Sequence, residues 1–363
     1  MVKRNILLNP GPATTTNTVK QAQIVPDICP REEEFGDVMQ EIREDLVRIA
    51  GGDNNYTSVL FAGSGTAVMD SVINSAVPPN KKILIINNGA YGERMVKIAK
   101  TYNIDLVELG FEWGTKVDLD KARSILKKDG EISCLAVVHH ETTTGILNPI
   151  REIGEIAYEN NCNFIVDTIS SFAGIPFSIK ECNIDFMMST SNKCIQGMAG
   201  VAFVICKKSE LEKIRDYPRR SFYLDLYSQY EFLEKKKQTR FTPPVQIIYA
   251  LRQAIKEFFE EGAENRYHRY KENYDTLIRG LKKRGFKFFL KDDAEQSCIL
   301  ITIIEPDHPN FDFRTFHDKL YKRGFTIYPG KLKDENTFRI AVMGAIDHND
   351  IKNFLEAVDE VLD

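Results

Sequence analysis

Short apolar runs alternate with helical patterns over the first two hundred residues of this chain. Continuous apolar segments predict buried strands at 58–61, 83–86, 106–109, 134–138, 164–166, 186–188 and 201–205. Around and between them, apolar residues recur at intervals of three and four, as in the segment 32–51, which predicts helices. Strands separated by helices in this way predict an α/β fold with a mainly parallel sheet and right-handed crossovers.

The pattern changes after residue 205. Charged and aromatic residues at 217–223 and 240–244 predict an exposed excursion from the sheet. Helical patterns at 245–255 and 262–283 come next, and the later elements are strands at 286–290, 298–303, 326–328 and 337–342 with helices at 314–322 and 348–362. These later elements predict a smaller α+β layer. We therefore expect a large domain of residues 13–260 and a small C-terminal domain of residues 261–363.

Residues 1–12 form a third expected part, an N-terminal arm that joins the functional site. The stretch from Leu7 to Pro12 places a proline on each side of Gly11. Proline has no amide donor and fixes its own backbone angle, which excludes a regular helix or a central strand here. Such an arm either begins a domain or presents its backbone amides to an anion.

The composition excludes several classes of partner. The 363 residues carry 48 basic and 52 acidic side chains, a formal charge of -4, and no long basic block, so nucleic acid is not an expected partner. The apolar run near the amino terminus is too short for a signal peptide, and no later run spans a bilayer, so we expect a cytoplasmic protein without a membrane partner. The 7 cysteines and 6 histidines lack the spacing of a disulfide framework or a metal site.

Polar residues that could react or bind a ligand follow the predicted strands. Ser64, Tyr91, Thr142, Asp167 and Lys193 each stand just beyond the end of a different apolar run. Ligands of parallel sheets gather at the carboxyl ends of the strands. Independent loop residues are not expected to collect along one edge, so the sequence predicts a single ligand site there.

Asp167 and Lys193 suggest the kind of ligand. A lysine amine that forms a Schiff base and a carboxylate that keeps a pyridinium nitrogen protonated are what pyridoxal phosphate chemistry requires. A Gly-Ser-Gly-Thr turn at 63–66, between a strand and a helix, would direct backbone amides and hydroxyls at a phosphate. The simpler alternatives are that Asp167 caps a turn, that Lys193 is a solvated loop residue and that the turn only caps its helix.

With these residues placed, the sequence resembles the class V aminotransferase family of the type I pyridoxal phosphate fold. The resemblance covers nearly the whole chain. Its most specific pieces are His-Glu-Thr-Thr-Thr-Gly at 140–145 and Asn-Lys-Cys-Ile-Gln-Gly at 192–197. It implies pyridoxal 5'-phosphate as the cofactor, the large domain as its binding domain, and a homodimer whose subunits share active sites.

The resemblance also implies individual roles. Lys193 and Asp167 would be catalytic, as the Schiff-base lysine and the partner of the pyridine nitrogen. The implied cofactor contacts are Ser64, Gly65, Thr66, Tyr91, Thr142, Asp167, Asn192, Lys193 and, from the other subunit, Thr242. Tyr91 and Asn192 fall where broader relatives have tryptophan and glutamine. The implied substrate contacts are Arg339, Asn9 and Gly11.

The implied reaction moves an amino group from 2-aminoethylphosphonate to pyruvate and gives phosphonoacetaldehyde and L-alanine. An alternative is a transaminase that uses alanine or serine with glyoxylate or pyruvate, and a remote one is a sensor that binds the cofactor without catalysis. A cysteine desulfurase would need a reactive cysteine on a mobile loop, whereas Cys298 is expected in an apolar strand.

Overall fold

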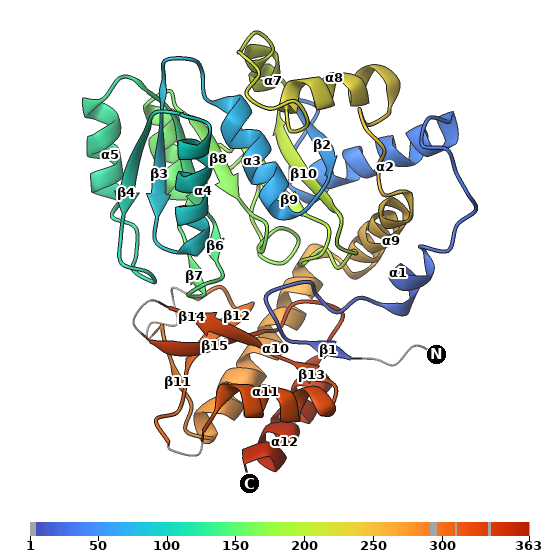
Figure 1. Cartoon of the computed structure of the whole chain (residues 1–363), viewed down its shortest axis with the longest axis vertical. Helices are drawn as coiled ribbons and strands as arrows, with labels where there is room; N and C mark the ends of the chain where they lie inside the picture. The colour runs from blue at the N-terminus through green and yellow to red at the C-terminus, as the bar shows by residue number, and fades with distance from the viewer. Residues whose placement is uncertain (1–4, 291–295, 309–310, 333–334, 363) are drawn as a thin grey trace.

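The structure is a computed structural model that describes residues 5–290, 296–308, 311–332 and 335–362. The first four residues of the expected arm and the last residue of the expected small domain lie outside these ranges. Figure 1 shows a larger part built on one sheet above a smaller part built on another, with the start of the chain beside the smaller part.

The larger part is organised around a seven-stranded sheet. In order across it, the strands are β2 (Tyr56–Ala62), β10 (Val201–Lys207), β9 (Phe186–Thr190), β8 (Asn163–Asp167), β5 (Ile132–Val138), β3 (Lys82–Asn87) and β4 (Leu106–Gly110). Neighbours pair in parallel except at β10, which is antiparallel to both β2 and β9. The predicted α/β class with a mainly parallel sheet is therefore confirmed.

Helices cover both faces of this sheet. The chain moves from β3 to β4 in one direction and from β5 to β8 in the other, and right-handed crossovers then place the connecting helices on opposite faces. Accordingly, α4 packs against α3, and α6 packs against α5. The helices of this part that precede β8 are α1 (Asn17–Gln21), α2 (Glu33–Ile49), α3 (Gly65–Ala76), α4 (Ala90–Thr101), α5 (Leu119–Lys128) and α6 (Ile150–Glu159).

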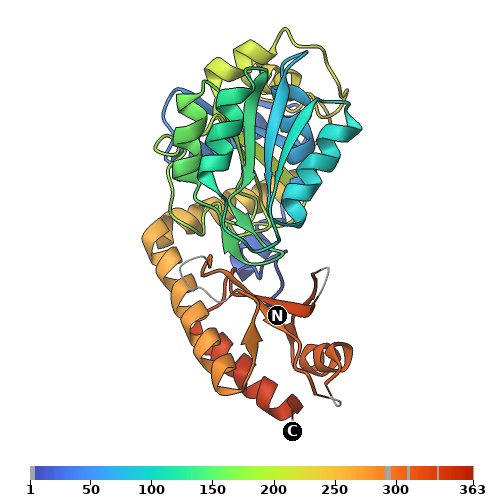
Figure 2. The ribbon, with the colours of Figure 1, turned by 90° about the vertical axis from the view of Figure 1, so that its left-hand side faces the viewer.

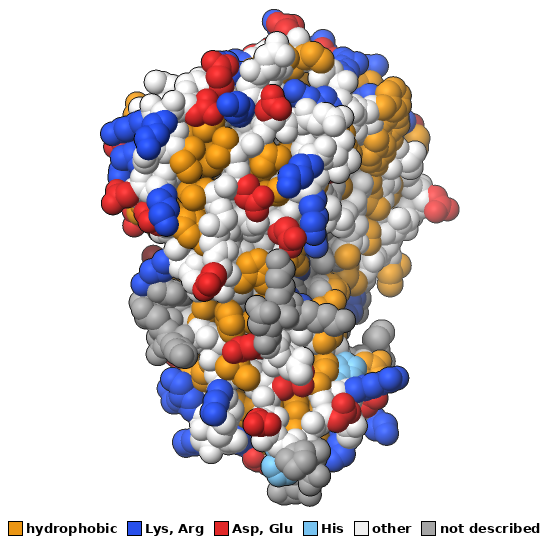
Figure 3. All heavy atoms as spheres, turned by 60° about the vertical axis from the view of Figure 1, so that its left-hand side comes forward, with side chains coloured by type: hydrophobic (Ala, Val, Ile, Leu, Met, Phe, Trp, Pro, Cys, Tyr) orange, Lys and Arg blue, Asp and Glu red, His pale blue; other side chains and the backbone are white. Residues whose placement is uncertain are grey.

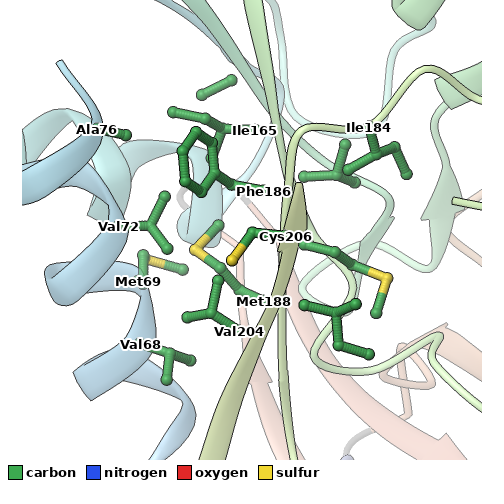
Figure 4. Packing of buried hydrophobic residues seen from close by; sticks show 14 of the residues in the cluster. Val68, Met69, Val72, Ala76, Ile165, Ile184, Phe186, Met188, Val204 and Cys206 are labelled. Carbon is green, nitrogen blue, oxygen red and sulfur yellow. The ribbon is translucent and has the colours of Figure 1, made fainter. Parts of the chain in front are cut away.

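The α3–sheet contact shows why the apolar periodicity forms this core. Residues 68, 69, 72 and 76 share one face of α3, and all four side chains are fully buried. Figure 4 shows this face turned toward side chains of β8, β9 and β10, namely Ile165, Phe186, Met188, Val204 and Cys206. Burying one large aliphatic side chain contributes about 1.5–3 kcal/mol, so this face holds α3 against the sheet.

The segment from 217 to 244 is exposed only in part, which corrects the predicted excursion. Phe222 is 80% exposed, but α8 (Leu226–Lys236) packs against β2 and α3, and Leu226 and Leu233 are fully buried. The charged and aromatic residues around these leucines hid their helical spacing. The remaining helices of this part are α7 (Lys208–Ile214) and α9 (Val245–Glu261).

Within its described residues, the smaller part contains a four-stranded antiparallel sheet and three helices. Its strands, in order, are β11 (Lys287–Phe288), β12 (Leu300–Ile304), β15 (Asn336–Ala341) and β14 (Tyr328–Lys331). Its helices are α10 (Ala263–Lys283), α11 (Phe313–Lys322) and α12 (His348–Leu362). Figure 2 shows α10 running down one side of this part from the larger one. We propose the domain boundary near residue 261, where α9 passes into α10.

Two expected strands of the smaller part differ from the structure. The strand expected at 326–328 is divided between β13 (Phe325–Thr326), which pairs in parallel with β1 (Ile6–Leu7), and β14, which pairs with β15. Cys298 lies two residues before β12 rather than within a strand. Pairing with distant segments decides both boundaries, and a local pattern does not contain that information.

The surface carries both signs of charge. On the face drawn in Figure 3, acidic and basic side chains are interspersed, with hydrophobic side chains between them. None of the helices within the described ranges is long and apolar enough to cross a lipid bilayer.

Candidate active site

Lys193 lies in the turn that follows β9. The Gly197 amide closes this turn on the Ser191 carbonyl at 2.7 Å, and the Lys193 ammonium donates a hydrogen bond to the Pro10 carbonyl of the N-terminal arm. Gly11 has a φ of +120°, and a Cβ there would overlap the Lys193 side chain. Glycine at this position therefore lets the arm close over the lysine, which gives a structural reason for Gly11.

Asp167 is the last residue of β8, the strand beside β9. Its side chain is buried, and its Oδ1 accepts a hydrogen bond of 2.8 Å from the Ile169 amide. The pKa of Asp167 is raised to about 7, mainly by burial and also by the charge of Glu141, against the opposing effects of the hydrogen bond from the Ile169 amide and of the charges of Arg94 and Lys193. Burial also lowers the pKa of Lys193 to about 8, although Asp167 opposes this. A buried cation beside Asp167 would favour its ionised form.

The depressed pKa of Lys193 predicts a pH dependence for the cofactor-free protein. An ammonium does not attack carbonyl or acylating reagents, so reactivity should rise with pH through a midpoint near 8 instead of the ordinary 10.5. Competitive acetylation at a series of pH values, read by mass spectrometry of the Lys193 peptide, measures that midpoint. Exposed Lys213, within the same digest, is the control. A midpoint near 10 for Lys193 would contradict the burial argument.

The segment 140–147 forms a tight hairpin from β6 (His140–Glu141) and β7 (Ile146–Leu147). The buried Glu141 carboxylate accepts hydrogen bonds from the Thr143 hydroxyl at 2.7 Å and from the Tyr91 amide at 3.0 Å. It thereby holds the first turn of α4 against the hairpin that carries Thr142. Burial raises the pKa of Glu141, and the hydrogen bonds that it accepts oppose the rise.

Tyr91 was expected in a loop, but it lies in the first turn of α4. Its ring is half-buried, and the Arg94 guanidinium lies over it, 4.6 Å from the ring centroid. Arg94 also donates a hydrogen bond of 3.1 Å to the Thr66 hydroxyl. The predicted contact between Tyr91 and a cofactor ring would therefore use the face that Arg94 leaves open.

The predicted phosphate contacts lie at the start of α3. Ser64 is the N-cap residue, yet its side chain makes no capping hydrogen bond and is exposed. A Cβ at Gly65 would lie 2.8 Å from the Ile169 side chain, so glycine lets this turn approach the end of β8 closely. With the Thr66 hydroxyl beside it, the helix start can bind a phosphate through amides and hydroxyls.

Arg339 reaches the site from β15 of the smaller part. Its two terminal nitrogens donate to the Thr142 carbonyl at 3.2 Å and to the Pro329 carbonyl at 3.1 Å, and its guanidinium lies 5.0 Å from the centroid of the Tyr328 ring. Burial lowers the pKa of Arg339, and nearby Tyr91, Tyr328 and Glu141 oppose this. Arg339 therefore joins the two parts of the molecule at the hairpin.

Three buried polar atoms around the site have no hydrogen-bond partner within the described residues. They are Asn9 Oδ1, His140 Nε2 and Arg339 Nε. The Ser170 hydroxyl donates to the His140 carbonyl, so His140 Nδ1 is the donor toward Ser170 and Nε2 keeps a free lone pair. Unpaired buried polar atoms are costly, and their grouping here fits a site for a polar ligand with both donors and acceptors.

Two of the predicted cofactor contacts, Asn192 and Thr242, have their own surroundings in the structure. Asn192 accepts a hydrogen bond of 3.1 Å from the Thr190 hydroxyl, and its carbonyl accepts from the Ala13 amide. Thr242 is exposed and forms no hydrogen bond with the site residues that the structure describes. Its neighbour Arg240 donates to the Phe222 carbonyl within an exposed aromatic cluster. The role of Thr242 toward another subunit stays a prediction.

Sequence reasoning missed the groups that support the lysine turn. The Tyr270 hydroxyl of α10 donates to the Cys194 carbonyl at 3.3 Å and accepts from the Gly344 amide at 3.0 Å, and buried Arg266 donates to the same carbonyl at 3.1 Å. Lys193 and the segment after β15 are thus held by one helix. Arg94 was also missed, because the stretch around Tyr91 was expected as a loop, whereas in the structure Arg94 lies one turn after Tyr91 on α4.

Comparison with known proteins supplies the chemical context. The family model described as "Aminotransferase class-V" matches residues 19–323. A protein named 2-aminoethylphosphonate--pyruvate transaminase from Lysinibacillus sphaericus (strain C3-41) is 44% identical over 358 residues, covering 98% of this chain and 97% of the relative. A bifunctional phosphonoacetaldehyde hydrolase/aminoethylphosphonate transaminase from Clostridioides difficile (strain 630) is 41% identical over 360 residues, covering 98% of this chain and 56% of that protein.

A solved structure shares the whole fold. The alanine--glyoxylate aminotransferase from Nostoc sp. matches with a TM-score of 0.92 and 26% identity, covering 100% of this chain and 96% of that one. The site residues described above therefore lie on a scaffold that carries amino-group transfer in that protein.

Proposed function

The chain belongs to the class V aminotransferase family, and we propose that it transfers an amino group from 2-aminoethylphosphonate to pyruvate, giving phosphonoacetaldehyde and L-alanine. The observation that carries this proposal is the 44% identity, over nearly the full length of both chains, to a transaminase of that name. The test is the donor itself, because 2-aminoethylphosphonate must react with the cofactor-loaded protein when no acceptor is present. Reaction only with alanine or serine would favour the alternative transaminase.

Pyridoxal 5'-phosphate is the cofactor that we propose for this site. When bound, it supplies a carbonyl that condenses with amines and a protonated ring that withdraws electrons from the substrate carbon. The residues present suit it: an amine at Lys193, a carboxylate at Asp167, hydroxyls and amides at the start of α3, and nearby buried polar atoms that lack partners. Asp167 would hold the proton on the ring nitrogen.

Lys193 is the residue that we propose to bind the cofactor and then to move the proton. Burial brings its pKa to about 8, so a useful fraction of the side chain is a free amine near neutral pH. A general base is most effective when its pKa lies close to the working pH. Its hydrogen bond to the Pro10 carbonyl holds the amine beneath the N-terminal arm.

Arg339 is the proposed anchor for both substrates. The donor carries a phosphonate and no carboxylate, whereas pyruvate and alanine carry a carboxylate. A guanidinium fork pairs with either oxyanion through two hydrogen bonds. The free Nε of Arg339 supports this role, and we propose that Asn9 and the amides near Gly11 supplement it from the arm.

A homodimer with shared active sites is proposed from the exposed segment around Thr242. In a C2 dimer, this segment of one subunit can lie beside the cofactor of the other. Inactive Lys193→Ala and an inactive Thr242 or Arg240 variant, mixed and allowed to exchange subunits, should then regain part of the wild-type activity. Each variant mixed with itself is the control. Full activity of a monomer would contradict the arrangement. The cytoplasmic location that the sequence predicts for the protein stays a prediction.

A further inference from the structure

Arg94 is a cation at the site without an acidic partner among the described residues. Its guanidinium lies 4.6 Å from the centroid of the Tyr91 ring and donates to the Thr66 hydroxyl at 3.1 Å. The neighbouring Glu93 pairs with Lys97 instead. A cation–π contact and one neutral hydrogen bond orient a guanidinium, but they do not neutralise its charge.

The charge of Arg94 acts on the catalytic pair. Burial is the main cause of the altered pKa of both Asp167 and Lys193, and Arg94 lowers both pKa values through its charge. Arg94 is therefore close enough to interact electrostatically with the groups that face the cofactor. At the same time, Thr66 ties it to the start of α3, where the phosphate is proposed to lie. Both observations place an unneutralised cation inside the site.

We propose that Arg94 binds a tetrahedral phosphorus oxyanion in this site, as a further binding residue beside Ser64, Gly65 and Thr66. The inference rests on the proposed function, which brings two such groups: the phosphate of the cofactor and the phosphonate of the donor. A guanidinium presents a planar fork of N–H donors that matches such oxyanions. Tyr91 and Thr66 hold the fork ready, so little side-chain entropy is lost when the anion binds.

Two arms of one experiment distinguish the two sources of the oxyanion. In the first, cofactor-free Arg94→Met is titrated with pyridoxal 5'-phosphate and with pyridoxal, which has no phosphate, and binding is read from absorbance. In the second, cofactor-saturated protein is tested with 2-aminoethylphosphonate and with L-alanine, which has a carboxylate instead. Methionine keeps much of the apolar stem and removes the charge.

We expect a loss of about ten- to a hundredfold, the magnitude of a charge-assisted hydrogen bond. If Arg94 binds the cofactor, affinity falls for pyridoxal 5'-phosphate but not for pyridoxal. If Arg94 binds the donor, the KM for 2-aminoethylphosphonate rises and that for L-alanine does not. Arg94→Lys should show a smaller change in the same measurement, either the affinity for pyridoxal 5'-phosphate or the KM for 2-aminoethylphosphonate. The control is Arg48→Met, because the Arg48 guanidinium also lies 4.6 Å from an aromatic ring centroid. This variant should change neither the affinity for pyridoxal 5'-phosphate nor the KM for 2-aminoethylphosphonate.

Unchanged affinity for pyridoxal 5'-phosphate together with an unchanged KM for 2-aminoethylphosphonate would overturn the proposal. Should Arg94→Met not fold, Arg94→Lys decides by the same two readings, because it keeps the charge and loses only the fork. A wild-type protein that does not react with 2-aminoethylphosphonate would refute the proposed function alone. The cofactor arm would still report on Arg94.

Discussion

Replacing Lys193 by alanine is expected to abolish transamination and the yellow colour of the cofactor-loaded protein together. General acid–base catalysis contributes about 10²–10⁴-fold, and this variant also loses the covalent hold on the cofactor, so the rate should fall by at least that factor. The physical basis is the position of the amine, which is half-buried, interacts with the charge of Asp167 and lies under the arm at Pro10.

Borohydride reduction measures the covalent part of this prediction. In the wild-type protein, reduction should fix the cofactor to the peptide that contains Lys193, which mass spectrometry identifies. The exposed Lys180, which pairs with Asp53 away from the site, provides the matched control Lys180→Ala, and this change should leave colour and rate unaltered. Labelling of any other lysine, or a coloured and active Lys193→Ala protein, would refute the assignment.

Arg339→Lys is expected to slow both half-reactions by about ten- to a hundredfold. Lysine keeps the charge, but it loses the fork that can bind an oxyanion while contacting the Thr142 and Pro329 carbonyls. A charge-assisted hydrogen bond contributes about 1.5–3 kcal/mol, which corresponds to this loss in specificity.

The kcat/KM for 2-aminoethylphosphonate and for pyruvate, measured separately, tests the shared anchor. Arg323→Lys is a matched control, since Arg323 pairs with Glu360 on the surface of the same part of the molecule, and it should not alter either value. If Arg339→Lys slowed the reaction with only one substrate, the two anions would have different anchors.

Much of the larger part follows from local patterns. The continuous apolar runs of β3, β5 and β8 predict strands that are buried on both faces, and each ends where polar residues begin. Because parallel strands bring such ends to one edge, the sequence places Asp167 and Lys193 near one another before any coordinates are considered. The structure agrees, with β8 and β9 as neighbours.

The supporting groups could not be predicted in this way. Tyr270 and Arg266 come from α10, more than seventy residues after Cys194, whose carbonyl they bind, and only the tertiary fold joins them. The division of 325–331 into β13 and β14 depends likewise on partners at opposite ends of the chain. In α8, the polar and aromatic residues between Leu226 and Leu233 masked a buried helix face.

A single-turnover measurement of the donor tests the central claim most directly. Cofactor-loaded protein is mixed separately with 2-aminoethylphosphonate, L-alanine, serine and aspartate, with no acceptor, and conversion of the cofactor to its amino form is followed by absorbance. The account predicts fast conversion by 2-aminoethylphosphonate and by L-alanine, with phosphonoacetaldehyde and pyruvate as the respective products. Fast conversion by serine or aspartate, with none by 2-aminoethylphosphonate, would contradict it.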